Sequence, residues 1–135
     1  MERRADPPGP PGGPDDPARP ARFGRTHRLS RTWQYQRAYA EGSSLRGRLV
    51  VLYAHVVAGE PSRLGIVASR KVGGAVVRNR TKRRLREIGR ALWPTVRSDG
   101  RQLVLIALPS AASAASADLA ADVTDLLRRM EALVP

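Results

Sequence analysis

A densely basic segment with a helical period is the feature that most constrains this chain. Six of the nine side chains in residues 78–86 are Arg or Lys. At about 100° per residue, one narrow arc of a helix collects the less polar side chains. These are Val77, Thr81, Leu85, Ile88 and Leu92. One stripe can therefore dock on a core, while the remaining circumference presents cations of the kind that suit a polyphosphate backbone.

The positive charge belongs to the middle of the chain. The whole chain carries +12, but residues 22–101 carry +15, the residues before them −1 and the residues after them −2. A localised field of this size indicates an anionic polymer or a membrane surface as the partner. Only two of the 24 cations are Lys. Codon bias and the bidentate grip of guanidinium on phosphate both account for the Arg excess, and the two explanations are compatible.

The composition excludes several classes of protein. The chain has no cysteine, so neither disulfides nor cysteine metal sites are expected, and a reducing cytoplasm is the expected location. No apolar run reaches the roughly 18 residues of a membrane span, and no signal peptide is recognisable. His27 and His55 are far apart, which favours structural or surface roles over metal ligation. We therefore expect no cofactor or metal bound by the protein alone, and no membrane partner.

The hydrophobic pattern predicts one α+β domain after a disordered tail. Residues 1–22 hold seven of the eleven prolines and no hydrophobic period, so they are predicted to be disordered, with a weak RNA contact as the alternative. Residues 23–135 form the domain, with helices packed on a small mixed sheet in the order α-β-β-α-β-α. The predicted elements are a helix over 31–41 with Ser30 as its N-cap, strands over 49–57 and 64–69 paired antiparallel, a helix over 75–92, a strand over 102–108, and a last helix from about Ser116. A split of the first strand around Arg48, or an extra short strand, is also allowed.

The sequence contains no recognisable hydrolase constellation. The acids of the central region are scattered, with no pair spaced for acid–base work or two-metal coordination. They are Glu41, Glu60, Glu87 and Asp99. The spacing of a helix-turn-helix or of a zinc site is also missing, which disfavours a DNA-binding protein. If the chain takes part in phosphodiester hydrolysis, the catalytic groups lie elsewhere.

The basic segment also resembles a known family. Arg78-Asn79-Arg80, followed by Lys82, Arg83 and Arg86, is similar to the signature of the protein subunit of bacterial ribonuclease P, the ribonucleoprotein that trims the 5′ leader from precursor tRNA. The lead-in over residues 64–73 and the segment from Arg28 to Arg48 match as well, so that the resemblance covers about residues 27–130. It implies a left-handed crossover through the basic helix, against the usual handedness. It also implies that the RNA subunit, with Mg²⁺, performs the cleavage.

The resemblance assigns roles to particular side chains. The residues expected to contact the catalytic RNA are Arg78, Asn79, Arg80, Lys82, Arg83 and Arg86. A solvated cationic face is the alternative, but repulsion between like charges four residues apart favours a partner that relieves it. Arg84 ranks lower, because it borders the apolar arc. Leu108 stands where the family usually has a basic residue. A structural RNA-binding protein of ribosomal type is the alternative function.

Three tyrosines are the second candidate site. Tyr35 and Tyr39 share one face of the first helix, and Tyr53 lies on the first strand. Composition alone favours packing in the core. The resemblance instead implies a cleft for the single-stranded leader of precursor tRNA, flanked by Arg70 and Lys71, where rings stack on unpaired bases. Trp33 and Trp93 are predicted to be packing residues.

Overall fold

The computed structural model describes residues 23–135, so the predicted disorder of residues 1–22 lies outside the described residues. Within this described part, three helices and four strands confirm the predicted order and the extra short strand. They are α1 (Thr32–Glu41), β1 (Ser43–Arg46), β2 (Val50–Val56), β3 (Arg63–Val67), α2 (Ala75–Leu92), β4 (Arg101–Ala107) and α3 (Ser116–Arg129). Short 3₁₀ turns are η1 (Arg25–His27), η2 (Arg70–Val72), η3 (Trp93–Thr95) and η4 (Pro109–Ser113).

The first helix begins one residue later than predicted. Arg31, not Ser30, is the N-cap residue of α1, and its side chain makes no capping hydrogen bond. The buried Gln34 side chain takes over this role, because its Oε1 accepts hydrogen bonds from the backbone N–H of Ser30 (2.9 Å) and of Arg31 (3.0 Å). Gln34 thus satisfies donors that a helix start leaves without partners.

The predicted direct pairing of the strands over residues 49–57 and 64–69 is wrong, because the corresponding strands β2 and β3 are not neighbours in the sheet. The strand order is β1-β2-β4-β3, so that β4 lies between β2, to which it is antiparallel, and β3, to which it is parallel. The physical reason is burial: residues 102–105 of β4 are buried on both faces, as an interior strand requires. The β2–β3 loop therefore passes the start of β4, where Ser62 Oγ donates to Arg97 O (2.7 Å) and accepts from Arg101 N (2.9 Å).

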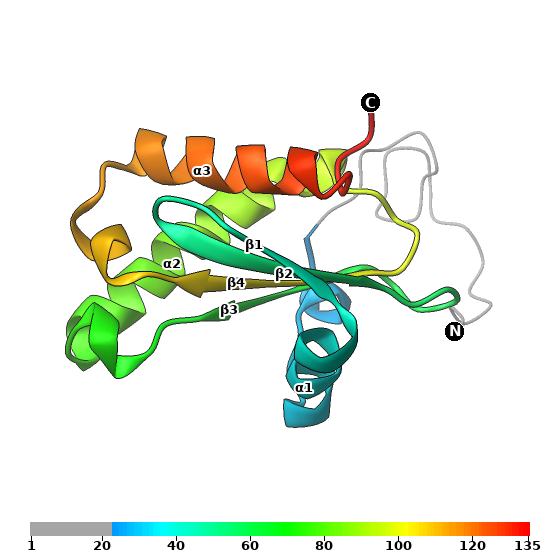
Figure 1. Ribbon diagram of the computed structural model, residues 1–135, viewed down its shortest axis with the longest axis horizontal. Coiled ribbons are helices and arrows are strands. Elements are labelled where there is room, and N and C mark those ends of the chain that lie inside the picture. The colour runs from blue at the N-terminus through cyan, green and yellow to red at the C-terminus, as the bar shows by residue number, and fades with distance from the viewer. Residues whose placement is uncertain (1–22) are drawn as a thin grey trace, which may run out of the picture.

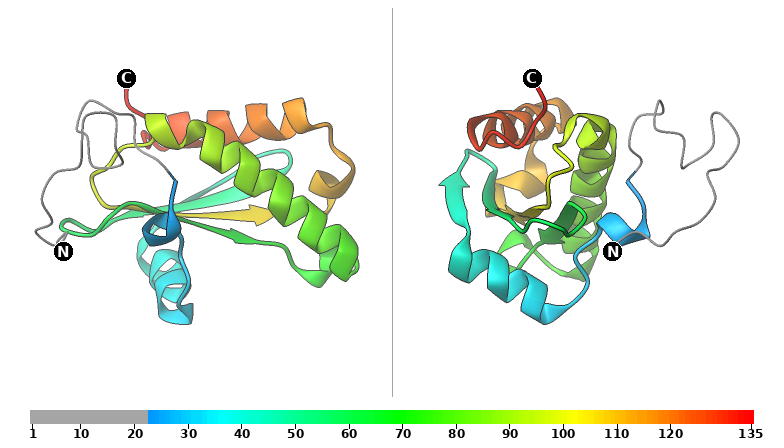
Figure 2. Two further views of the ribbon diagram at one scale, coloured as in Figure 1. Left: turned by 180° about the vertical axis from the view of Figure 1, so that it is seen from behind. Right: turned by 90° about the vertical axis from the view of Figure 1, so that its right-hand side faces the viewer.

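Helices cover the two faces of the sheet unequally. Figures 1 and 2 show α2 and α3 side by side on one face and α1 alone on the other. The main core lies under α2 and α3, and its largest fully buried side chains are Leu52, Leu85, Leu103, Leu105, Leu119 and Leu126. A smaller cluster of Leu29, Ala38 and Val104 lies under α1. Among residues 23–135, no other helix covers that second face.

The connection from β3 through α2 to β4 has the unusual hand. Seen from the α2 side, with both parallel strands pointing to the right, β4 lies above β3 (Figure 2, left). The crossover is therefore left-handed, as the resemblance implied and against the general preference. This topology places the start of α2 beside the uncovered face of the sheet.

The turn between β1 and β2 is held by a single carboxylate of α3. Asp122 accepts backbone hydrogen bonds from Arg48 (3.2 Å), Leu49 (2.9 Å) and Val50 (3.1 Å). Gly47 allows this approach, because a Cβ there would lie 2.5 Å from Asp122 Oδ2. The carboxylate thus ties the turn between the paired strands β1 and β2 to α3.

Asp122→Ala is expected to lower the free energy of unfolding by about 2–3 kcal/mol, because three backbone donors lose a charged acceptor. Urea titration measures this loss. Asp125→Ala is the matched control on the same helix: its exposed ion pair with Arg129 contributes about 0.5 kcal/mol or less. Equal losses for the two variants would show that the carboxylate does not hold the turn.

Candidate nucleic-acid interface

Helix α2 docks through the predicted stripe. Thr81 and Leu85 are buried, whereas Val77 and Ile88 are half-buried against the main core. Gly89 completes the contact on the β3 side, since a Cβ there would lie 2.5 Å from Leu64 Cδ2. The stripe fixes the rotation of the helix and thereby decides which cations face outward.

Outside the stripe, residues 78–86 of α2 present exposed or half-buried cations. Asn79, Arg80, Arg83 and Arg86 are exposed, and Arg78 and Lys82 are half-buried. Within residues 23–135, no carboxylate forms an ion pair with any of these cations. Arg78 does have a local partner, because its Nη1 donates to Gly73 O at 3.2 Å. The structure therefore brings the six predicted RNA-subunit contacts together on one helix and leaves their positive field unneutralised.

Arg84 differs from its neighbours. Its Nη1 donates to Ala111 O (3.3 Å), and its Nη2 donates to Ala114 O and to Ser116 Oγ (3.4 Å). These bonds fasten α2 to η4 and to the start of α3. The guanidinium is committed to the fold, in agreement with its lower rank as an RNA contact.

The tyrosines lie on the sheet face that α1 only partly covers. The ring centroids of Tyr39 and Tyr53 are 5.0 Å apart in an edge-to-face arrangement, and Tyr39 is 39% exposed. Tyr35 is more enclosed: its hydroxyl donates to Leu29 O (3.2 Å), and its ring crosses Gly65, where a Cβ would lie 2.6 Å from Cε1. The three residues thus combine the two predicted roles, with Tyr35 packing and Tyr39 offering ring surface.

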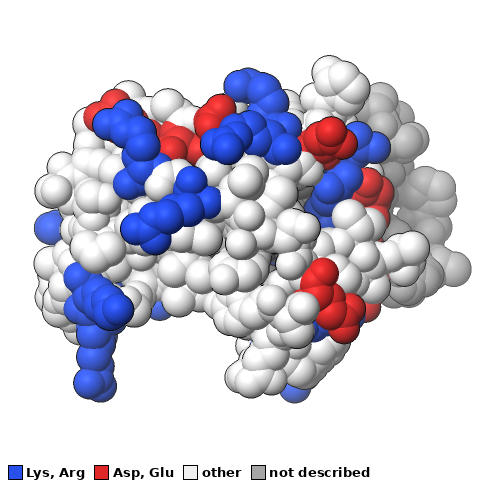
Figure 3. Space-filling model, viewed as in Figure 1, with Lys and Arg blue, Asp and Glu red and all other residues white. Residues whose placement is uncertain are grey.

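The uncovered sheet face forms a hollow beside these rings. Figure 3 shows it between α1 and the end of the molecule where η2 leads into α2, and cations project at that end. Arg70 and Lys71 belong to η2 and are exposed. Half-buried Val67 and Ile106 pack with Tyr35 and Tyr53 on the same face. We name this hollow the tyrosine groove; α1 carries Tyr35 and Tyr39 at one end, and η2 carries Arg70 and Lys71 at the other.

Strand β3 lies between the two surfaces. Its Leu64 meets Gly89 of α2, where a Cβ would lie 2.5 Å from Leu64 Cδ2, and the Tyr35 ring crosses its Gly65. The cationic helix and the tyrosine groove therefore flank the same strand. Burial raises the pKa of the Tyr35 hydroxyl, and the positive charge of Arg86 opposes that rise.

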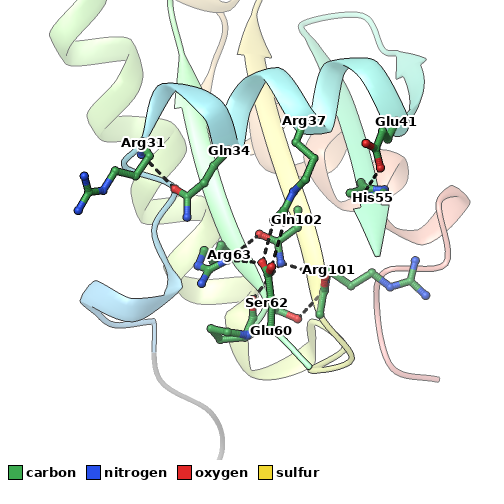
Figure 4. A network of polar contacts seen from close by, with 12 residues as sticks. Arg31, Gln34, Arg37, Glu41, His55, Glu60, Ser62, Arg63, Arg101 and Gln102 are labelled. Atoms are coloured by element: carbon green, nitrogen blue, oxygen red, sulfur yellow. Dashed lines mark hydrogen bonds and ion pairs between the residues drawn. The ribbon is translucent and has the colours of Figure 1, made fainter. Parts of the chain in front are cut away.

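An ion-pair network that sequence reasoning missed sets the position of α1 (Figure 4). Glu60, in the β2–β3 loop, accepts from Arg37 of α1 (2.7 and 3.0 Å) and from Arg63 of β3 (2.8 Å). Arg63 also donates to the buried Gln102 (3.3 Å), whose Nε2 donates to Pro61 O and Gly100 O. In the sequence, Glu60 is only one of the scattered acids, and no local pattern links it to Arg37.

The network predicts a particular pH dependence. The Arg37 and Arg63 guanidiniums hold the pKa of Glu60 down, from 4.5 to about 2. A lowered folded-state pKa stabilises the protein above the unfolded-state value, and this stabilisation is lost as the pH falls toward 2. Glu60→Gln is therefore expected to cost about 1–2 kcal/mol at neutral pH, discounted for partial exposure of the pair.

Chemical denaturation across pH 2–7 checks this expectation. The difference between wild type and Glu60→Gln should shrink as the pH falls below about 4.5. Glu87→Gln is the control, because the Glu87–Arg90 pair is solvent-exposed. A difference that stays constant with pH would show that the Glu60 charge does not support the fold.

One tryptophan prediction is confirmed and the other is wrong. Trp93 is 3% exposed and packs edge-on against Phe23, with ring centroids 5.0 Å apart. Trp33 is 53% exposed, because α1 buries the neighbouring Gln34 and Ala38 instead. The histidines have structural partners as predicted: His27 Nδ1 accepts from Gly24 N (3.1 Å), and His55 Nε2 lies 3.5 Å from Glu41 Oε1.

No group of three or more His, Cys, Asp or Glu in residues 23–135 is arranged to hold a metal ion. No helix in this part of the chain is long and apolar enough to cross a membrane.

Comparisons with known proteins agree with this geometry. A family model described as Ribonuclease P matches residues 23–131. The ribonuclease P protein component of Symbiobacterium thermophilum is 44% identical over 108 residues, which are 78% of this chain and 91% of that protein. The component from Beutenbergia cavernae is 46% identical over 100 residues, covering 72% and 82%.

Solved structures show the same fold. The RNase P protein of Staphylococcus aureus superposes with a TM-score of 0.72 at 26% identity, over 79% of this chain and 97% of that one. The RNase P protein of Thermotoga maritima gives a TM-score of 0.67 at 30% identity, over 76% and 96%.

Proposed function

Because the chain belongs to the ribonuclease P protein family, we propose that it binds the catalytic RNA subunit through α2 and the 5′ leader of precursor tRNA through the tyrosine groove. The observation that carries this proposal is the adjacency of the two surfaces. Helix α2, which carries the cations, packs against β3, and the Tyr35 ring of the tyrosine groove crosses Gly65 of the same strand. One protein can thus bind a folded RNA and an unpaired strand at the same time.

Each surface suits its proposed RNA. Guanidinium and ammonium groups bind phosphates without reading base sequence, which is how a folded RNA is held through its backbone. Arg78, Asn79, Arg80, Lys82, Arg83 and Arg86 supply those contacts. Ring stacking tolerates any base, and this suits an enzyme whose substrates differ in leader sequence. Tyr39 and Tyr53 supply rings, Tyr35 supports them, and Arg70 and Lys71 hold the phosphates of the strand.

We assign the chemical step to the RNA. The four acids of the central region are all within ion-pair distance of a cation or His: Glu41 of His55, Glu60 of Arg37 and Arg63, Glu87 of Arg90, and Asp99 of Arg97 and Arg101. None is placed to activate water. The described residues do not fit a Mg²⁺ site, so the Mg²⁺ of the holoenzyme is proposed to be held by RNA. A cytoplasmic location remains a prediction.

Purified protein alone is therefore expected not to cleave precursor tRNA, whichever divalent ion is added. With the catalytic RNA of the same organism and Mg²⁺, a single cut at the mature 5′ end is expected. Gel analysis of end-labelled precursor tRNA measures both. Sequencing the RNA that copurifies with the protein from cells distinguishes this function from a ribosomal one, since ribosomal RNA would then dominate.

Robust cleavage by RNA-free protein would refute this division of labour. A protein that copurifies with ribosomal RNA, and does not stimulate the catalytic RNA, would refute the proposed function itself.

A further inference from the structure

Helix α1 has a second exposed flank, opposite the tyrosine groove. Gln34 and Ala38 point into the protein, and the helical period places Tyr35 and Tyr39 to one side of them. Trp33 and Arg37, four residues apart, share the other side. The proposed leader site uses only the first flank, so the exposed aromatic ring on the second has no assigned role.

Trp33 and Arg37 form a fixed pair. The Arg37 guanidinium carbon lies 5.0 Å from the centroid of the Trp33 ring, in a cation–π arrangement. Glu60 holds that guanidinium through two hydrogen bonds of 2.7 and 3.0 Å. The cation is therefore anchored from below, and the ring that rests on it is 53% exposed. An indole in this setting offers a π surface that needs little further ordering to stack on a partner.

The surroundings of Trp33 favour a polyanion. Residues 23–40 contain no acid, and they contain three exposed arginines besides Arg37. These are Arg25, Arg28 and Arg31. An exposed aromatic ring in a segment rich in exposed arginines is the composition of a surface that binds single-stranded nucleic acid, where bases stack and phosphates pair with cations.

We propose that Trp33 stacks on an unpaired base in the upstream part of the precursor tRNA leader, after the strand has left the tyrosine groove and crossed α1. This inference rests on the proposed function. The crossing is short, because a helix with its side chains is about 10–12 Å across. The outer face of α1 that the strand would cross carries exposed Gln36 and Ala40, which present neither a charge nor a bulky side chain.

The test uses precursor tRNAs whose leaders lengthen one nucleotide at a time, bound to the holoenzyme. Trp33→Ala is expected to lower affinity about tenfold for long leaders, the loss of one base stack. It should leave affinity unchanged for short leaders and for the catalytic RNA alone. Trp33→Phe should recover most of the affinity. Tyr39→Ala should instead weaken short and long leaders alike. Only a small fall in melting temperature is expected for Trp33→Ala, because the ring is half exposed and its cation–π contact with Arg37 contributes little to stability.

Fluorescence gives an independent readout. Trp33 is exposed and Trp93 is buried, so quenching by bound RNA should come from Trp33. The quench should appear only above a threshold leader length and should vanish in Trp33→Phe. A loss of affinity that does not depend on leader length, or that appears with the catalytic RNA alone, would overturn the assignment to the leader. Unchanged affinity at every length would overturn the site.

The two proposals fail differently in this experiment. If the wild-type holoenzyme does not distinguish precursor from mature tRNA, the proposed function fails. If it does, and Trp33→Ala behaves as wild type, only the Trp33 site fails.

Discussion

Replacing Arg80 and Arg83 together by alanine is expected to lower affinity for the catalytic RNA by about 100-fold, because two charged contacts to phosphate are lost. The slope of log affinity against log salt should flatten by about 0.7–0.9 for each contact removed. Both side chains are exposed and have no ion-pair partner within the described residues. The free energy of unfolding should therefore stay within about 0.5 kcal/mol of wild type. Salt-dependent binding to the catalytic RNA measures the first two quantities.

Arg84→Ala is the matched control, since it removes the same charge from the same helix. Its guanidinium bonds to Ala111, Ala114 and Ser116, so its loss should lower stability by about 1–2 kcal/mol and leave the salt slope nearly unchanged. Leu85→Asp places a charge in the main core and should unfold the protein. If Arg80 and Arg83 can be removed without a change in affinity or slope, the cationic face of α2 is solvated surface.

The hydrophobic period was enough to predict α2, because the same pattern determines that the segment is helical and which of its side chains face outward. Once Thr81 and Leu85 are placed in the core, the outward direction of Arg80 and Arg83 follows from the helical repeat. The buried strand β4 could be predicted equally well, because a short unbroken run of apolar residues is typical of an interior strand.

Contacts between residues far apart in the sequence could not be predicted in this way. A short connection predicts that β2 and β3 pair with each other, but β4 lies between them in the sheet. Asp122 and Glu60 act on residues far away in the sequence, and their own neighbours give no sign of it. The hand of the crossover came from the family resemblance alone.

The tryptophans and tyrosines show how the rotation of one helix decides which aromatic rings are exposed. Aromatic residues are usually core, which made packing the expected role of Trp33. Helix α1 instead buries Gln34, whose side-chain oxygen caps the helix start, and this rotation leaves Trp33 outside. The same rotation turns Tyr39 toward the groove. Helix propensity does not predict the rotation of α1, because that rotation depends on the hydrogen bonds of one polar side chain, Gln34.

Tyr39→Ala is expected to weaken binding of precursor tRNA by about 1–3 kcal/mol and to leave binding of mature tRNA unchanged, because only the precursor has a leader to stack on the ring. Tyr39 is 39% exposed and touches Tyr53 edge-on, so the loss of stability should be small. The measurement is the ratio of the two dissociation constants for the holoenzyme, at one salt concentration.

Tyr35 calls for a different substitution, because its ring rests on Gly65 and its hydroxyl bonds to Leu29 O. Tyr35→Phe keeps the ring and removes one hydrogen bond, so it should cost about 1 kcal/mol of stability and little leader affinity. Tyr35→Ala should lower both stability and affinity, since it leaves a cavity beneath the groove. If Tyr39→Ala weakens precursor and mature tRNA equally and also lowers the melting temperature, Tyr39 is a core residue. The groove would then have to bind its strand through Tyr53, Arg70 and Lys71.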